Sequence, residues 1–175
     1  MSAASRFPHL GLRPARAGDA SRVADVYLAS RKTFLPFAPL AHSDAEVRGW
    51  IGDVLVPSGQ VTVAVWREEI AGMMAVSSDR GHGWIEQLYL HPAFVGRGFG
   101  SRLLEHGLAA AARPVRLYCF AENSAARRFY ERHGFVAIEF GDGSANEEGC
   151  PDVLYELTAE LWKSPPGVQG SGAKG

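Results

Sequence analysis

Three glycines within five residues, between a strand-like run and a helix-like run, limit most strongly what this chain can fold into. Residues 84–90 are largely apolar and β-prone, and His91-Pro92 ends them because proline cannot donate to a strand ladder. Glycines at positions 96, 98 and 100 follow, and apolar residues with helical spacing then continue until Pro114. This order of strand, glycine-rich turn and helix predicts an α/β architecture in which the turn leads into the start of a helix.

The remaining segments predict a mixed central α/β sheet with about four flanking helices, in one domain over residues 6–163. Asp19 can cap a helix whose apolar positions keep the 3.6-residue period. Residues 61–66 and 70–76 form a predicted hairpin, whereas residues 79–83 are expected to be a loop. Further strands are expected at residues 10–15, 115–119, 135–140 and 152–157, with a further helix at residues 124–133.

Two other segments have clear local signals. Ser43 and Glu46 form the pattern of a capping box, which predicts a helix that starts at this point and stops at Pro57. This helix is expected to bury one face, made of Val47, Trp50, Ile51, Val54 and Leu55. Residues 164–175 are expected to form a mobile tail, because two prolines and four glycines leave little apolar surface to bury.

The composition excludes several classes of function. Eighteen basic and 19 acidic residues leave a formal net charge of −1, so nucleic acid is not an expected partner. No run approaches the roughly 18 apolar residues of a membrane span, so no membrane association is expected. Two cysteines are too few for a disulfide framework, and the six histidines never have metal-ligand spacing. We therefore expect a cytoplasmic protein without a metal.

The glycine-rich turn has the features of an anion site. Alternating glycines before a helix let successive backbone N–H groups point into one concavity at the positive helix end, which suits a phosphate. Arg97 adds a permanent cation that can hold a diphosphate through two contacts. The spacing matches neither the dinucleotide fingerprint nor the phosphate loop of nucleotide hydrolases, and a purely structural turn is the alternative.

Two motifs resemble those of the GNAT superfamily of N-acetyltransferases. The first is Leu88-Tyr89-Leu90-His91-Pro92 followed by Gly96-Arg97-Gly98-Phe99-Gly100-Ser101, which is similar to the family's acetyl-CoA-binding motif. Val95 stands where the family usually has Gln or Arg. The second motif is residues 123–135, which include Asn123 and the pairs Phe129-Tyr130 and Gly134-Phe135. The resemblance covers about residues 10–160.

The resemblance implies a single GNAT-like domain with acetyl-CoA as co-substrate. It implies a sheet that is splayed between its fourth and fifth strands, with the pantetheine arm of acetyl-CoA in the gap. A gap of this kind leaves unpaired backbone groups that an amide-bearing ligand can satisfy. The residues assigned to acetyl-CoA are Leu88, Tyr89, Leu90, Val95, Gly96, Arg97, Gly98, Phe99, Gly100, Ser101, Asn123, Ala126 and Phe129.

Glu86 and Tyr130 are the candidate catalytic residues. A carboxylate inside a central strand is costly to bury, so Glu86 is predicted to face the site as a general base, while Gln87 points to the other face. A structural ion pair between Glu86 and an arginine is the alternative. Deprotonating an alkylamine of pKa about 10.4 costs roughly 4.6 kcal/mol at pH 7, so a general base matters for such an acceptor.

By the resemblance, Tyr130 stands where family members place the acid that protonates the leaving thiolate; a core aromatic is the alternative. Cys119 is expected to be a buried thiol and not an acetylated intermediate, so transfer is expected to be direct.

Two regions are candidates for binding the acceptor. By the resemblance, Phe34 and Phe37 lie where related enzymes form the acceptor wall. Glu147 and Asp152 belong to a small acidic cluster that can attract a cationic amine, although a solvated acidic loop needs no function.

With these residues, the resemblance implies an acetyl-CoA-dependent N-acetyltransferase that acts directly on a primary amine, of a small molecule or of a protein. A catalytically silent sensor that binds CoA or acyl-CoA in the same groove is the alternative. The residues leave the oligomeric state open, a homodimer included.

Overall fold

The computed structural model describes residues 9–162, so the tail predicted at residues 164–175 lies outside the described part of the chain. The strands are β1 (Leu10–Pro14), β2 (Val61–Trp66), β3 (Glu69–Asp79), β4 (His82–Leu90), β5 (Val115–Phe120), β6 (Val136–Gly141) and β7 (Asp152–Leu157). The helices are α1 (Ala20–Phe34), α2 (Asp44–Trp50), α3 (Phe99–Ala110) and α4 (Ser124–Arg132). Within residues 9–162, each helix is too short or too polar to cross a membrane.

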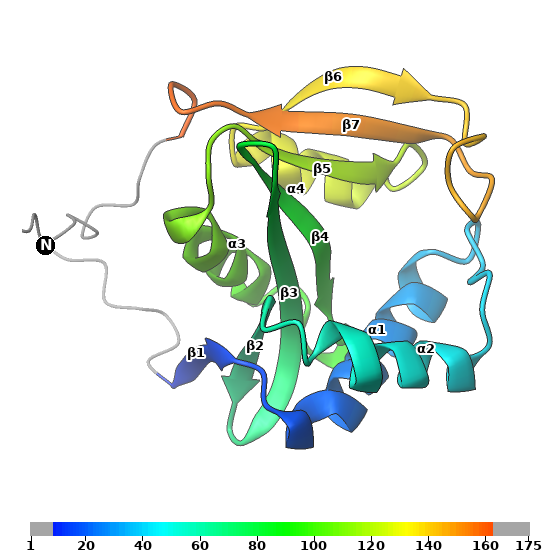
Figure 1. Cartoon of the computed structure of the whole chain (residues 1–175), viewed down its shortest axis with the longest axis vertical. Helices are drawn as coiled ribbons and strands as arrows, with labels where there is room; N and C mark the ends of the chain where they lie inside the picture. Colours follow the sequence, from blue (N-terminus) through cyan, green and yellow to red (C-terminus); the bar gives the residue numbers. More distant parts are fainter. Residues whose placement is uncertain (1–8, 163–175) are drawn as a thin grey trace, which may run out of the picture.

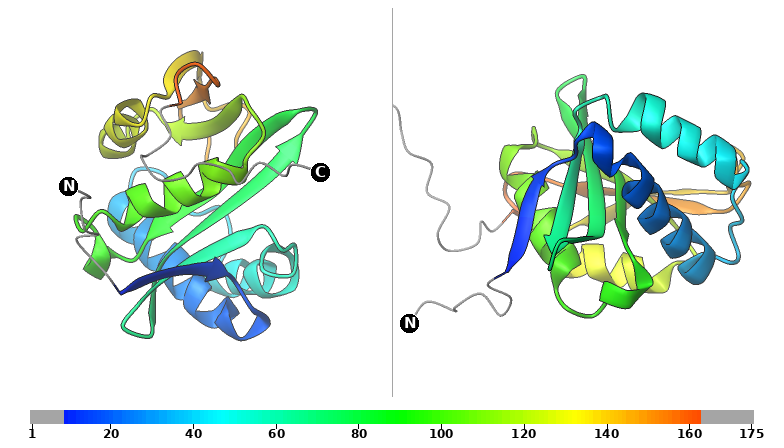
Figure 2. Two further views of the ribbon diagram at one scale, coloured as in Figure 1. Left: turned by 90° about the vertical axis from the view of Figure 1, so that its left-hand side faces the viewer. Right: turned by 90° about the horizontal axis from the view of Figure 1, so that it is seen from below.

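The strands form one seven-stranded sheet between two layers of helices (Figures 1 and 2). The strand order is β1-β2-β3-β4-β5-β7-β6, and every neighbouring pair is antiparallel except β4 and β5. α1 and α2 cover one face, around the buried Val23 and Met73. α3 and α4 cover the other, around Leu103 and Leu117. The predicted mixed sheet with four flanking helices is confirmed.

β3 and β4 are longer than the sequence predicts. The loop expected at residues 79–83 is wrong, because Asp79 pairs with His82 and only Arg80 and Gly81 form the turn. Both turn residues have positive φ, 48° and 82°, which matches the twist of strands joined by a two-residue turn. The turn therefore lengthens both central strands.

The second predicted helix is divided in the structure. The Ser43 hydroxyl accepts the N–H of Glu46 at 3.3 Å, and the Glu46 carboxylate accepts the N–H of Ser43 at 2.8 Å, so the capping box is confirmed. After Trp50 the backbone continues as one π-helical turn over Ile51–Leu55. Because this turn is wider than an α-helical one, Val54 is exposed and Trp50 lies at the surface. The single apolar face expected for this segment is therefore wrong at these two residues.

Asp19 precedes α1 but does not cap it as predicted. Its carboxylate accepts the backbone N–H of Arg16 at 2.7 Å and two guanidinium N–H groups of Arg13 at 2.7 and 3.0 Å. The hydrogen bonds from Arg13 lower the pKa of the Asp19 carboxyl. Asp19 therefore stabilises the 3₁₀ turn that leads into α1.

Candidate active site

A cavity of about 860 Å³ opens where β4 and β5 separate. Figure 1 shows the two strands diverging. The two strands pair only at Gly83 with Val115 and at Trp84 with Arg116, and they diverge beyond these positions. β4 is bonded to β3 along its other edge, so the backbone groups that face β5 have no neighbouring strand there. The predicted splay between the fourth and fifth strands is confirmed.

Four parts of the chain line this cavity. They are α1 and α2 with the loop between them, the middle of β4, the end of β5 with α4, and β6 and β7 with the loop between them at residues 142–151. The predicted site residues that line it are Glu86, Leu88, Tyr89, Asn123, Ala126, Tyr130, Glu147 and Asp152. The glycine-rich turn at residues 95–101 lies outside the lining, so the cavity is the end of the site away from the turn.

Glu86 is the extra residue of a β-bulge in β4. Ala75 of β3 pairs with Gln87, and the next residue, Val76, pairs with Ile85, so Glu86 has no partner across the ladder. The bulge interrupts the alternation of the strand. Residues 85–89 all line the cavity, Gln87 among them, so the expectation that Gln87 faces away from the site is wrong.

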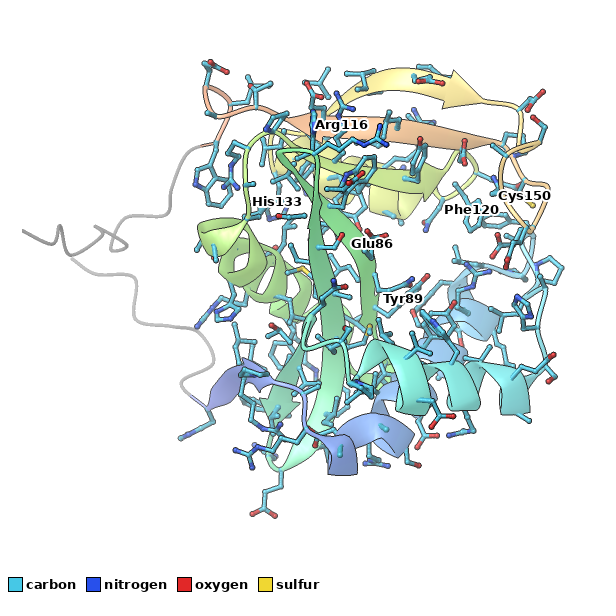
Figure 3. The ribbon with its side chains drawn as sticks, viewed as in Figure 1. Glu86, Tyr89, Arg116, Phe120, His133 and Cys150 are labelled. Atoms are coloured by element: carbon cyan, nitrogen blue, oxygen red, sulfur yellow. The ribbon has the colours of Figure 1, made fainter. Side chains whose placement is uncertain are left out.

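The Glu86 carboxylate lies exposed at the edge of the cavity. Its Oε1 atom accepts a hydrogen bond from the Ser77 hydroxyl of β3 at 2.5 Å. A serine therefore orients the carboxylate, in place of the arginine that the alternative interpretation required. Figure 3 shows Glu86 in the centre of the molecule, with Tyr89 further along the same strand.

The glycine-rich turn has the backbone geometry of an anion cradle. Gly96 and Gly98 have positive φ, 76° and 79°, and Gly98 immediately precedes α3. A Cβ atom at either position would meet nothing within 4 Å, so open space lies beside both glycines. The first N–H groups of α3 have no acceptor inside the helix and carry the positive end of its dipole. These residues therefore fit the phosphate-bearing part of acetyl-CoA.

Two side chains of the turn make contacts within the protein. Phe99 is fully buried, with its ring 5.5 Å from that of Trp66, so only its backbone can face a ligand. Arg97 donates to the Ala93 carbonyl at 3.4 Å, and its guanidinium lies 5.5 Å from the Phe94 ring.

Further predicted cofactor residues meet beside the turn. A Cβ atom on Gly100 would lie 3.5 Å from Leu90 Cδ1 and 3.6 Å from the Phe129 ring. Asn123 precedes α4, and its side-chain oxygen accepts the N–H of Ala126 at 3.2 Å, as expected for a helix cap. The start of α3 and Phe129 of α4 therefore lie beside Leu90 at the end of β4.

Tyr130 and Cys119 both line the cavity, and both keep their protons at neutral pH. Burial raises the pKa of the Tyr130 hydroxyl, so this side chain stays protonated and gives up its proton less readily than an exposed tyrosine. Burial also raises the pKa of the Cys119 thiol to about 12. Because the thiolate is the nucleophilic form of cysteine, Cys119 is poorly suited to carry an acetyl group.

The structure separates the four residues predicted to bind the acceptor. Glu147 and Asp152 line the cavity, and the Glu147 carboxylate lies 3.0 Å from Nε2 of His42. Phe34 and Phe37 do not line it. Phe34 is 42% exposed at the end of α1. The Phe37 ring packs edge-on against Phe120, which itself lines the cavity. An aromatic-rich loop predicts burial of some rings but not the direction of each one.

Comparison with known protein families agrees with this geometry. The sequence profile described as "Acetyltransferase (GNAT) family" matches residues 25–135, which is more than half of the 175 residues. The chain belongs to the acetyltransferase (GNAT) family. The co-substrate of this family is acetyl-CoA, which supplies the acetyl group as a thioester. The matched region ends before residues 142–151, so this loop, which lines the cavity, lies outside it.

Solved structures share the fold. PaiA N-acetyltransferase from Thermoplasma acidophilum, in complex with coenzyme A, is 20% identical with a TM-score of 0.68, over 85% of this chain and 98% of that chain. Ard1 from Thermoplasma volcanium is 18% identical with a TM-score of 0.65, over 83% and 95%. The apo form of YjaB from Escherichia coli is 22% identical with a TM-score of 0.63, over 84% and 96%. A comparison with curated proteins finds no match.

Sequence reasoning missed Arg31, which lines the cavity of this GNAT protein. Its side chain is only 4% exposed, and it lies one helical turn after Tyr27 and two after Val23, both of which are buried. A charged residue in line with an apolar stripe was the signal that could have revealed it, because arginine is rarely buried unless it is paired. Among residues 9–162, no group of three His, Cys, Asp or Glu side chains could hold a metal ion.

Proposed function

We propose that this protein transfers the acetyl group of acetyl-CoA directly to a primary amine bound in the cavity. The observation that carries the proposal is the position of Glu86, which the bulge in β4 and the Ser77 hydroxyl hold at the cavity edge. From this point of the strand, Glu86 can accept a proton from an amine in the cavity. The thioester-bearing arm of acetyl-CoA then binds in the gap between β4 and β5. We place the reaction in the cytoplasm, because Cys119 and Cys150 are both free thiols.

In this proposal the backbone binds acetyl-CoA. The amides of residues 96–101 hold the diphosphate at the start of α3. The N–H and C=O groups of residues 88–90 that face the gap bond the amides of the pantetheine arm, as an added strand would. A backbone N–H near Leu90 polarises the thioester carbonyl.

Glu86 and Tyr130 move the protons. The acceptor arrives as an ammonium ion, and Glu86 takes one proton from it through water. The nitrogen then attacks the carbonyl carbon, so that a C–N bond forms and the C–S bond breaks. Tyr130 donates its proton to the leaving thiolate and regains one from the nitrogen through water. The products are the N-acetyl amine, the free thiol of CoA and one proton released to solvent.

The charges around the cavity support a cationic acceptor. Six carboxylates line it, against one arginine that is already paired with one of them. These carboxylates belong to Glu46, Glu86, Glu139, Glu147, Glu148 and Asp152. Such a lining raises the local concentration of an alkylammonium ion, whether a small molecule or a protein carries it.

Calorimetry with acetyl-CoA and thiol release with a library of primary amines test this function. The library includes lysine-bearing peptides and peptides with free N-termini. We expect the protein to bind acetyl-CoA and to release the thiol only when an amine is present, with mass spectrometry detecting the acetylated amine. Tight binding without thiol release for any amine would identify a sensor instead, and absence of binding would exclude both functions.

A further inference from the structure

Arg31 joins four segments of the chain at the acceptor end of the cavity. Its Nη2 atom donates to Glu148 Oε1 at 2.8 Å and to the Ala38 carbonyl at 3.2 Å. Its guanidinium carbon also lies 5.4 Å from the ring centre of Phe120, at the end of β5. One side chain of α1 thus contacts the α1–α2 loop, β5 and the β6–β7 loop.

The loop that Arg31 holds is braced from within. The Asn146 amide nitrogen donates to the Cys150 carbonyl at 2.8 Å and to Asp152 Oδ2 at 3.0 Å, and the N–H of Cys150 donates to the Asn146 amide oxygen at 3.2 Å. The Cys150 sulfur lies 3.5 Å from the Phe37 carbonyl in the α1–α2 loop. Residues 142–151 therefore dock on that loop as one unit. Figure 1 shows the two loops meeting, and Figure 3 shows Cys150 at this junction.

Stability alone does not account for a guanidinium at this position. Its Nε atom is buried without a hydrogen-bond partner among residues 9–162. Attraction to a partner offsets the desolvation of a buried charge only when the geometry is good and the remaining donors are satisfied. Apolar side chains of similar volume often stabilise such a position equally well or better. The arginine therefore points to a role in the geometry of the cavity.

We propose that Arg31 is a positioning residue that holds residues 142–151 against α1 and thereby sets the affinity for the amine. The inference rests on the proposed function. The loop contributes Glu147 and Glu148 to the acidic lining, and it keeps them there because Arg31 anchors it. Loss of the anchor weakens amine binding far more than acetyl-CoA binding. Arg31 also bonds the Tyr89 side chain of β4, but in the proposed function the cofactor is held mainly by backbone groups of residues 88–90 and 96–101.

Two variants separate positioning from stability. Arg31→Met leaves the Glu148 carboxylate unpaired, whereas the double variant Arg31→Met/Glu148→Met leaves no charge without its partner. We expect the single variant to lose thermal stability and the double variant to regain it. Arg22→Met is the matched control, because Arg22 lies in the same helix with an exposed side chain.

Three measurements are compared across these variants. They are the KM in thiol release, the acetyl-CoA Kd by calorimetry, and hydrogen exchange of residues 142–151. The amine probes are n-butylamine and the library amine that the parent acetylates fastest. In both Arg31 variants we expect the amine KM to rise about tenfold or more and the loop to exchange faster, with a much smaller change in the acetyl-CoA Kd. Arg22→Met should change none of the three.

A double variant that regains the parental KM together with the parental Tm would show that Arg31 serves stability only, and would overturn the inference. Parental hydrogen exchange of the loop in the Arg31 variants would overturn it as well. A parent protein that releases no thiol with any amine overturns the proposed function instead. The parent protein is therefore assayed before the variants.

Discussion

The two ends of the site are built from different parts of the polypeptide. At the cofactor end, Gly96 and Gly98 leave open space, and the unpaired edge of β4 presents main-chain groups. At the acceptor end, side chains from α1, β5 and residues 142–151 meet at Arg31. Substitutions at the first end should therefore act through backbone conformation, and those at the second through the pairing of side chains.

The largest effect is expected at the cofactor end, from Gly98→Val. A β-branched residue at a φ of 79° is strained, and its side chain would occupy the space beside the amides. We expect acetyl-CoA affinity to fall about 1,000-fold or more, because several hydrogen bonds to charged oxygens are lost together. Calorimetry measures the Kd.

Gly59→Val is the matched control for backbone strain. Gly59 has a φ of 74°, equally open surroundings and no place in the site. Both variants should lose similar thermal stability, while only the change at Gly98 removes affinity. Equal acetyl-CoA affinities in the two variants would show that the glycine-rich turn is only a turn.

Glu86→Gln should separate chemistry from binding at the junction of the two ends. We expect kcat/KM to fall about 100-fold at pH 7 while the acetyl-CoA Kd stays the same. The loss should shrink as the pH approaches the pKa of the amine, because the amine then loses its proton without a base. Rates from pH 6.5 to 9.5 give this profile. A loss that is constant over that range would contradict the assignment of Glu86 as the base.

Tyr130→Phe should cause a smaller defect. A thiol of pKa about 8.5 leaves fairly well without an acid, so we expect kcat to fall only about tenfold. The acetyl-CoA Kd and the Tm should change little, because the ring stays in the core. A parental kcat would leave Tyr130 with a packing role alone.

The smallest effect is expected from His42→Asn. His42 of the α1–α2 loop contacts Glu147, next to the contact of Arg31 in α1 with Glu148, but the side chains of His42 and Glu147 are 53% and 71% exposed. Exposed pairs contribute little, so the amine KM should change by less than about threefold in the thiol-release assay. A change as large as that of Arg31→Met would mean that burial does not distinguish the two contacts.

The features that could be predicted from the sequence also differ between the two ends of the site. The glycine-rich turn and the Asn123 cap were predictable, because neighbouring residues encode them through φ preferences and short-range hydrogen bonds. The bulge at Glu86 was not, since residues 84–90 contain no glycine or proline to mark it and its position depends on pairing with β3.

At the acceptor end, tertiary contacts decide the outcome. Arg31 and Glu148 are 117 residues apart in the chain, and no local pattern joins them. The resemblance placed Phe34 and Phe37 at the acceptor wall, but Phe34, the last residue of α1, is exposed, and Phe37 in the α1–α2 loop packs against Phe120. Placement of such side chains requires the whole fold.

The divergence of β4 and β5 divides the sheet into two arms, like a pair of tongs. The arms are joined at Gly83 and Trp84, where the rings of Trp84 and Tyr118 stack at 6.0 Å. A pantetheine arm bonded along β4 would fill the gap between the two arms and connect them, as a further strand would. The thioester donor would then complete the architecture as well as supply a reactant, and the stiffness of the molecule across the split would depend on its presence.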